Sequence, residues 1–258
     1  MSVYIIAEAG CEHLGDIEKA KRMIDIAKDT GCNAIKFQHF YSNEINNGTK
    51  NGEILLRKIE DYGFSIAELV ILRDYADDKN INCFCSAFGI SSLKTLKDLG
   101  FKTVKIPSCC NENQEMLNYA VDNFDTVFLS DGMSNSSGLI CPNRGFDKMR
   151  WLLCTSAYPC PDDAVNLLAM SNNLCDGLSD HTIGSTAAVM AVALGAQYIE
   201  KHITISEFNG GPDAHIALEP TELMDFVYQI RRAEKMLGTG VKKIEECEKP
   251  YLWRKNNE

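Results

Sequence analysis

Eight short apolar runs, separated by helical or polar stretches, recur along this 258-residue chain and restrict its fold more than any other feature. The runs have the composition of β-strands and fall at residues 3–8, 33–39, 81–85, 103–106, 126–129, 150–154, 177–178 and 198–202. Consecutive strands joined by helices give either a doubly wound sheet or a closed barrel. Because eight units in about 250 residues match the usual size of the barrel, we predict an α/β fold, a (β/α)8 TIM barrel.

Apolar residues at helical spacing predict the connecting helices, of which the longest lie at residues 16–30, 65–79 and 219–237. Shorter helices are predicted at residues 53–61, 91–99, 113–122, 163–170 and 183–194. Between Ser130 and Lys148 the chain is rich in Asn, Ser, Gly and Pro, so the fifth helix is predicted to be short or missing. We assign residues 1–240 to the barrel and residues 241–258 to a charged C-terminal tail.

The formal net charge of −10 is not offset by any basic stretch, which argues against a nucleic-acid partner. The N-terminus lacks the basic region of a signal peptide, and no window approaches the roughly 20 apolar residues that span a bilayer. We therefore expect a cytoplasmic protein without a membrane partner. The eleven cysteines, none in C-x-x-C spacing, are interpreted mostly as small, reduced, buried side chains.

Polar and charged residues stand where the apolar runs end. In a barrel the carboxyl ends of all strands meet on one face, where active sites are built. A lone lysine or histidine at a strand end is more often a solvated or simply hydrogen-bonded residue, but here every strand end carries such a group. They are Glu8, Lys36, Gln38, Ser86, Lys105, Ser108, Ser130, Ser156, Tyr158, Asp180, His181, Glu200 and His202. Burying so many unpaired polar groups would be costly, so their gathering predicts a site.

The residue types narrow the chemistry of this site. Lys36 and Lys105, with serines nearby, are suited to a phosphate or carboxylate. His181 and His202 come from the last two strands and are suited to a divalent transition metal acting as a Lewis acid. Glu8, on the first strand beside the eighth, is the general acid/base candidate. The residues alone therefore predict a metal-assisted reaction on a small phosphorylated anion.

Eight ordered motifs resemble those of one enzyme family. The segment from Ile5 to Asp16 is similar to the opening IIAEIGxNHxGD, and AIKFQ, KIPS, LSDGM and CTSAYP follow in order. GLSDHT, EKHIT and GPD complete the series. The chain therefore resembles the sialic acid (N-acetylneuraminate) synthases from about Val3 to Gly240. Because the tail resembles the linker of that family, the resemblance implies the barrel domain without the C-terminal antifreeze-like domain.

The resemblance implies condensation of phosphoenolpyruvate with an open-chain N-acylated amino sugar, N-acetylmannosamine-like, to a nine-carbon α-keto acid and phosphate. It implies Glu8 as the proton-transfer residue and His181 and His202 as ligands of Mn2+, with Mg2+ or Co2+ as alternatives. The phosphoenolpyruvate-binding residues would be Lys36, Lys105, Ser108, Ser130, Ser156 and Tyr158. The sugar would contact Gln38, Tyr158 and Asp213. A homodimer is left open.

Two residues depart from the family pattern: Cys110 replaces an acidic residue, and Asp131 places a negative charge where we expect a phosphate. Three alternatives therefore stay open. One is a sister legionaminate or pseudaminate synthase, and another is a 3-deoxy-ulosonate synthase. The third is a barrel that binds a sugar or phosphate without turnover.

Overall fold

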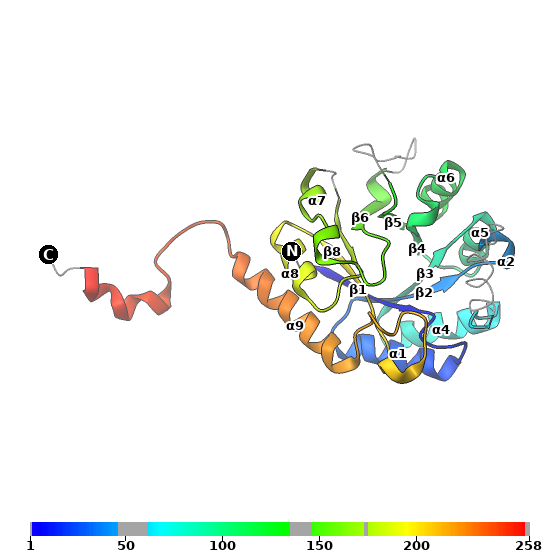
Figure 1. The fold of residues 1–258 in the computed structure, drawn as a ribbon, viewed down its shortest axis with the longest axis horizontal. Helices are drawn as coiled ribbons and strands as arrows, with labels where there is room; N and C mark the ends of the chain where they lie inside the picture. The colour runs from blue at the N-terminus through cyan, green and yellow to red at the C-terminus, as the bar shows by residue number, and fades with distance from the viewer. Residues whose placement is uncertain (1, 46–60, 135–145, 173–174, 256–258) are drawn as a thin grey trace.

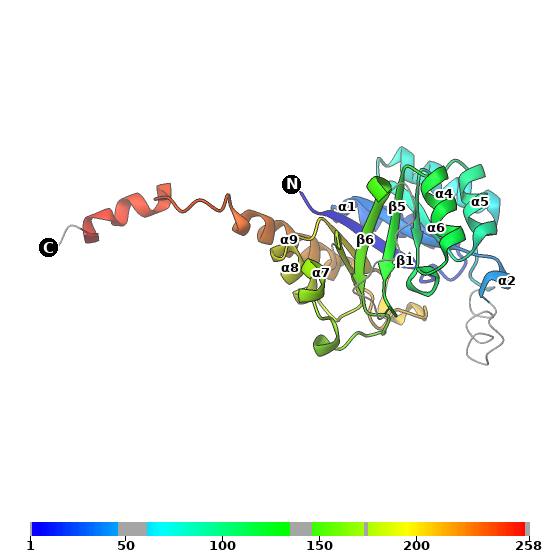
Figure 2. The same cartoon turned by 90° about the horizontal axis from the view of Figure 1, so that it is seen from above.

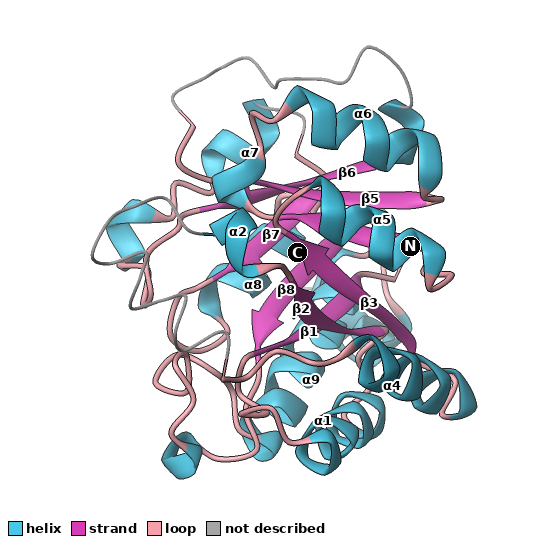
Figure 3. Ribbon diagram, turned by 90° about the vertical axis from the view of Figure 1, so that its right-hand side faces the viewer, coloured by secondary structure: helices cyan, strands magenta, loops and turns pink. Residues whose placement is uncertain are grey.

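Eight parallel strands close into a barrel in the order β1 to β8, with β1 hydrogen-bonded to β8 (Figures 1 and 3). The computed structural model describes residues 2–45, 61–134, 146–172 and 175–255. The strands are β1 (Tyr4–Gly10), β2 (Ala34–His39), β3 (Asn82–Ala87), β4 (Thr103–Ile106), β5 (Thr126–Asp131), β6 (Met149–Cys154), β7 (Gly177–Asp180) and β8 (Tyr198–His202). The predicted (β/α)8 barrel is confirmed.

The main helices cover the outside of the barrel (Figures 1 and 3). They are α1 (Ile17–Asp29), α4 (Ile66–Asp78), α5 (Ile90–Asp98), α6 (Gln114–Asn123), α8 (Thr186–Ala193) and α9 (Pro220–Leu237). Side chains that bond the free amides of the first turn fix two helix starts: Asp16 caps α1, and Ser65 forms a reciprocal capping box with Glu68 at α4. Two short helices, α2 (Ser42–Ile45) and α7 (Leu168–Asn172), lie in the connections.

Inside the barrel, an apolar layer lies beneath a polar one. Successive strand residues point to opposite sides, so Tyr4, Ile6 and Glu8 share the inner face of β1. The lower layer is a buried cluster of Ile6, Ala34, Phe84, Phe128 and Leu152, against which Tyr4 and Tyr198 pack. The larger core lies between the outer strand faces and the helices. Two residues further along the same inner faces come Glu8, Lys36, Ser86, Ser130, Cys154 and Glu200.

The structure differs from the predicted helices at a few places. The single helix predicted at residues 163–170 is instead a 3-10 turn at Asp162–Ala164 followed by α7. Between β5 and β6 the described residues form only a 3-10 turn, Phe146–Lys148, which agrees with a short or missing fifth helix; residues 135–145 lie outside the described part. The helix predicted at 53–61 also falls almost entirely outside it.

After α9 the chain leaves the barrel. Figures 1 and 2 show it running away from the body as an arm that ends in the 3-10 helix Glu246–Lys255. This arm corresponds to the predicted tail at 241–258; its assignment as a segment separate from a 1–240 domain stays a prediction. Among the residues that the structure describes, no helix has the length and hydrophobicity to cross a membrane.

Candidate active site

A cavity of about 320 Å³ opens at the carboxyl ends of the strands. It is lined by all eleven side chains to which the resemblance assigns a role: Glu8, Lys36, Gln38, Lys105, Ser108, Ser130, Ser156, Tyr158, His181, His202 and Asp213. Asp180, also expected at this site as a strand-end residue, does not line it. Register explains much of this grouping. Glu8 of β1 lies opposite Lys36 of β2 on one side and His202 of β8 on the other. The structure thus brings the predicted residues together; their individual roles stay predictions.

Two lysines and two glutamates form a buried charged cluster at the floor of the cavity. The Lys36 Nζ lies 2.5 Å from Glu8 Oε2 and 3.8 Å from Glu200 Oε2. The Lys105 Nζ donates to both oxygens of Glu200 at 2.8 Å. All four side chains are at most 5% exposed. Because two positive charges face two negative ones, each buried charge has a partner, as burial requires.

The environment shifts the pKa values within this cluster in different directions. Burial raises the pKa of Glu8, against the opposing effect of Lys36. Burial would also raise the pKa of Glu200, but the lysines Lys105 and Lys36 together hold it well below its ordinary range. Burial lowers the pKa of Lys105 despite Glu200. Glu200 therefore stays ionised and balances the charge of the lysines, whereas Glu8 is the carboxyl better suited to exchange a proton.

Serine hydroxyls surround Gly132 beside this cluster. A methyl group built on Gly132 would come within 2.6 Å of both the Ser108 and the Ser156 hydroxyl oxygens. Ser130 and Ser86 also line the cavity, and Ser86 accepts a hydrogen bond from Lys36 at 2.7 Å. The absence of a side chain at Gly132 keeps a space between hydroxyl groups. That space, with Lys36 and Lys105 nearby, is suited to an anionic group.

Asp131 does not add its charge to this space, contrary to expectation. Its carboxylate accepts a 2.6 Å hydrogen bond from the Ser134 hydroxyl, and Asp131 is not among the residues that line the cavity. Strand alternation explains the difference, because Ser130 points inward and the next residue therefore points outward. The other departure, Cys110, donates to the backbone oxygen of Phe88 and is also absent from the cavity lining.

The two histidines lie side by side, with ring centroids 5.4 Å apart. Tyr158 covers both rings, at 4.2 Å from His181 and 5.8 Å from His202. His181 Nδ1 bonds the Thr155 carbonyl oxygen at 2.9 Å. The other ring nitrogen, Nε2, takes no part in this bond and is available to bind a ligand. His202 Nδ1 is buried, has no hydrogen-bond partner among the described residues, and lies 3.6 Å from Asp213 Oδ2.

This arrangement fits a cation held by two imidazoles. A backbone carbonyl that orients one ring and a buried ring nitrogen without a hydrogen bond are both features of ligating histidines. In the described ranges, however, no three His, Cys, Asp or Glu side chains are grouped so that they could hold one metal ion. A metal at His181 and His202 would therefore need further ligands from water or from a substrate.

Neighbouring side chains hold Glu8 and the two histidines in place. Gln38 donates to Glu8 Oε1 at 3.0 Å. On the outer side of the barrel, Lys201 donates to Asp180 Oδ2 at 2.9 Å and also bonds the Thr182 carbonyl. Both charged side chains are 1% exposed. Because Asp180 and Lys201 directly precede His181 and His202, this ion pair ties together the two strand ends that carry the histidines.

Glu12 fixes the loop that carries Asp213. Its Oε1 accepts the Asp213 backbone N–H at 2.8 Å, and a methyl group on Gly211 would lie only 2.1 Å from its Oε2. Burial, and to a smaller extent the Asp213 carboxylate, raises the pKa of Glu12 to about 7. No strand pattern singled out Glu12, because it lies in the turn after β1; the Gly-x-Glu-His string was the one available signal.

Four further residues belong to the site although no role was predicted for them: Glu200, which stands at a strand end, and Cys154, Ser179 and Gly132. Ser179 donates to Glu200 at 2.9 Å. Cys154 lines the cavity, 3.9 Å from His181 Nδ1. Burial alone would raise the pKa of its thiol, but His181 lowers it to about 7. Cys154 lies two residues after Leu152 on β6, so strand alternation could have predicted that its side chain points into the barrel.

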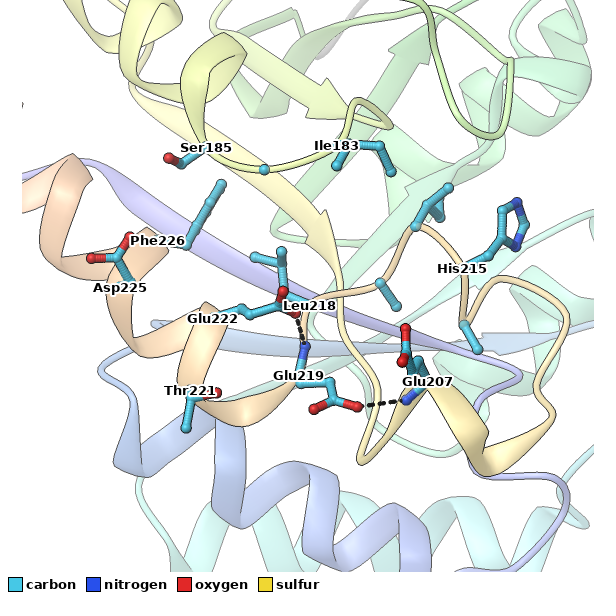
Figure 4. A pocket seen from close by; sticks show the side chains of 14 residues that line it. Ile183, Ser185, Glu207, His215, Leu218, Glu219, Thr221, Glu222, Asp225 and Phe226 are labelled. Carbon is cyan, nitrogen blue, oxygen red and sulfur yellow. Dashed lines mark hydrogen bonds between the residues drawn. The ribbon is translucent and has the colours of Figure 1, made fainter.

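Larger hollows lie outside the barrel and lack such a cluster. The one in Figure 4, about 630 Å³, is lined by acidic side chains near the start of α9. Two of these carboxylates already bond backbone amides: Glu219 accepts from Glu207 N and Glu222 accepts from Glu219 N (Figure 4). Another hollow, about 720 Å³, lies between α7 and α8 and is mainly apolar. The cavity at the strand ends is therefore the candidate active site.

The fold and this cavity define a (β/α)8 barrel with an ionisable site at the carboxyl ends of its strands, where enzymes of this fold place their active sites. The chain belongs to the NeuB family, which its sequence matches over residues 23–242.

Several proteins are similar to this chain over most of its length. It is 36% identical to the N,N'-diacetyllegionaminic acid synthase of Campylobacter jejuni subsp. jejuni, across 96% of this chain and 81% of that protein. It is 31% identical to the N-acetylneuraminate-9-phosphate synthase of Homo sapiens, across 95% and 74%. The crystal structure of the N-acetylneuraminic acid synthetase of Leptospira borgpetersenii in complex with citrate matches with a TM-score of 0.88 and 34% identity, over 100% and 92% of the two chains. The resemblance to sialic acid synthases is confirmed.

Proposed function

We propose that this protein condenses phosphoenolpyruvate with an open-chain 2-acetamido-2-deoxy sugar, N-acetylmannosamine-like, to form a nine-carbon α-keto acid and phosphate. The observation that carries the proposal is the buried Glu8–Lys36–Glu200–Lys105 cluster beside the serine-lined space at Gly132. Family membership supports the reaction class, because the relatives named above are synthases of N,N'-diacetyllegionaminic acid, N-acetylneuraminate 9-phosphate and N-acetylneuraminic acid.

The anionic end of phosphoenolpyruvate would occupy the space between the serines. Ser108, Ser130 and Ser156 would donate hydroxyl hydrogen bonds, and Lys36 and Lys105 would supply charge-assisted ones. In the cluster, however, both lysines are already balanced by glutamates. Uptake of a proton by Glu8 would leave the cluster one positive charge in excess, so anion binding and protonation of Glu8 would favour each other.

Glu8 would therefore hold or move the proton. Its Oε2 contacts Lys36, and Gln38 fixes its Oε1. The sugar would lie toward Gln38, Tyr158 and Asp213, on the histidine side of the cavity. Because burial raises its pKa, Glu8 keeps a proton to higher pH than an ordinary carboxyl, which favours a role as general acid.

His181 and His202 would hold the divalent ion, Mn2+ by preference and Mg2+ or Co2+ as alternatives. When bound, such an ion supplies Lewis-acid polarisation of a carbonyl oxygen. Calorimetric titration of Mn2+ into the wild-type protein and into the His181→Ala/His202→Ala double variant tests this assignment without turnover. We expect binding only by the wild type; equal affinity in both proteins would show that the metal binds at other residues.

The reaction is tested by phosphate release from phosphoenolpyruvate with a panel of amino sugars and divalent ions. We expect release that depends on both the sugar and the ion. Release with a single 2,4-diacetamido sugar would favour the legionaminate alternative, which the 36% identity to a legionaminic acid synthase supports. No release with any aldehyde acceptor would leave only the alternative of a barrel that binds a sugar or phosphate without turnover.

Glu8→Gln separates binding from proton transfer. The amide keeps the shape and the contact with Lys36 but cannot exchange the proton. We expect phosphate release to fall by at least about 10²-fold, the usual contribution of a general acid or base. Phosphoenolpyruvate affinity should be kept or rise, because glutamine, like protonated Glu8, leaves the positive charge of the two lysines in excess. Glu115→Gln, on the first turn of α6, serves as the matched control. Near-normal turnover of Glu8→Gln would remove Glu8 from the mechanism.

A further inference from the structure

Two consecutive cysteines lie at the rim of the candidate active site. Cys109 and Cys110 follow Ser108 in the 3-10 turn Ser108–Cys110, just after β4. Cys109 is exposed and lines the cavity, whereas Cys110 is half-buried. Their sulfur atoms lie 3.7 Å apart and share a hydrogen bond. The pair thus combines access from solvent with direct contact between two thiols.

The two thiols differ in reactivity. The hydrogen bond shared by the two thiols lowers the pKa of Cys109, while the same bond and burial raise the pKa of Cys110. A thiolate that forms readily at an accessible position next to a second thiol is the arrangement typical of reversible oxidation sites. Cys247, the other exposed cysteine among the described residues, lies on the C-terminal arm and provides a natural comparison.

We propose that Cys109 and Cys110 form a dithiol modification site, at which a peroxide produces a reversible disulfide that reshapes the phosphate side of the cavity. Hydrogen peroxide transfers one oxygen to the Cys109 sulfur and leaves as water, giving a sulfenic acid. The Cys110 sulfur then attacks it: the S–S bond forms, the S–O bond breaks, and a second water leaves. Two molecules of a small thiol restore both cysteines and become a disulfide.

Closure of this bond must change the turn. Consecutive Cα atoms across a trans peptide are about 3.8 Å apart, less than the roughly 4.4–6.8 Å usual in disulfides. The turn is held by hydrogen bonds from Cys110 N to Pro107 O and from Asn111 N to Ser108 O. Rearranging it displaces Ser108, one of the two hydroxyls beside Gly132. A strained, exposed disulfide is also readily reduced, so the change is reversible.

The chemistry is tested without reference to any substrate. Wild type, Cys109→Ser, Cys110→Ser and the control Cys247→Ser are treated with hydrogen peroxide, and their peptides are mapped by mass spectrometry without reduction. We expect a peptide that has lost two hydrogens between Cys109 and Cys110 in the wild type and in Cys247→Ser. Phenylarsine oxide, which forms two As–S bonds with a dithiol and releases water, should be retained by the same two proteins. Absence of the disulfide, or equal arsenical retention by Cys110→Ser, would overturn the proposal.

The structural consequence is read from amide hydrogen exchange of residues 108–111. We expect exchange to accelerate at least about tenfold on oxidation and to return with dithiothreitol; unchanged exchange would refute the reshaping. The link to the cavity rests on the proposed function. We expect phosphoenolpyruvate affinity of the oxidised protein to fall at least about tenfold. If the reduced protein binds no phosphoenolpyruvate, the proposed function fails while the disulfide and exchange results still decide this inference.

Discussion

Replacing Glu12 by glutamine should make the protein more stable at neutral pH. Glu12 is fully buried, and its pKa of about 7 lies well above the ordinary value of 4.5. Since the folded state binds the proton more tightly than the unfolded chain, stability is lost as pH rises from the ordinary value toward the raised one. At about 1.4 kcal/mol per unit, the full loss is roughly 3 kcal/mol. Glutamine keeps an oxygen for the Asp213 N–H and does not ionise.

The measurement is urea unfolding of both proteins at several pH values. Between about pH 5 and about pH 8 we expect the advantage of Glu12→Gln to grow by roughly 2–3 kcal/mol. Glu68→Gln is a control of opposite sign, because hydrogen bonds from Ser65 lower the pKa of Glu68. Its carboxylate stabilises the fold above its ordinary pKa of 4.5, so Glu68→Gln should show a constant deficit between about pH 5 and about pH 8 that shrinks only at lower pH. A difference between wild type and Glu12→Gln that is constant with pH would refute the reasoning.

Other substitutions test other contacts. Lys201→Met leaves Asp180 buried without its charge partner, so we expect a loss of about 3–5 kcal/mol of unfolding free energy in urea; a loss below about 1 kcal/mol would contradict the importance of the pair. Gly132→Ala places a methyl group against two flexible serine hydroxyls. It should weaken phosphoenolpyruvate binding by about 10- to 100-fold in calorimetry with little change in stability. Glu44→Ala removes the acceptor of Ser92 N–H and hydroxyl at the start of α5 and should cost about 1 kcal/mol.

The strand ends made the site predictable. Residues two apart on a strand share a face, so Lys36 with Gln38 and Glu200 with His202 could be assigned to the cavity from spacing alone. Eight repeating units then fixed the barrel, because parallel strands with short right-handed connections allow few topologies. Local rules and the global fold therefore agree over most of the chain.

Partners distant in the sequence could not be predicted in the same way. Spacing places Glu200 on an inner face, but its pairing with Lys105, 95 residues away, depends on the barrel's register. The role of Glu12 depends on a turn that packs against a loop 201 residues later. The helix expected at 163–170 divides at Asn166, whose left-handed backbone (φ 49°) interrupts an α-helix.

Closure of the barrel through β1 and β8 also has a consequence for biosynthesis. Glu8 is synthesised nearly 200 residues before Glu200 and His202. Until then, Lys36 and Lys105 lack Glu200 as their counter-charge, and a nascent chain cannot bury them cheaply. The ionisable core should therefore assemble only after β8 has been synthesised. A chain stalled before β8 would expose these charged residues to chaperones and proteases. Incomplete barrels would therefore not persist as stable, inactive folds.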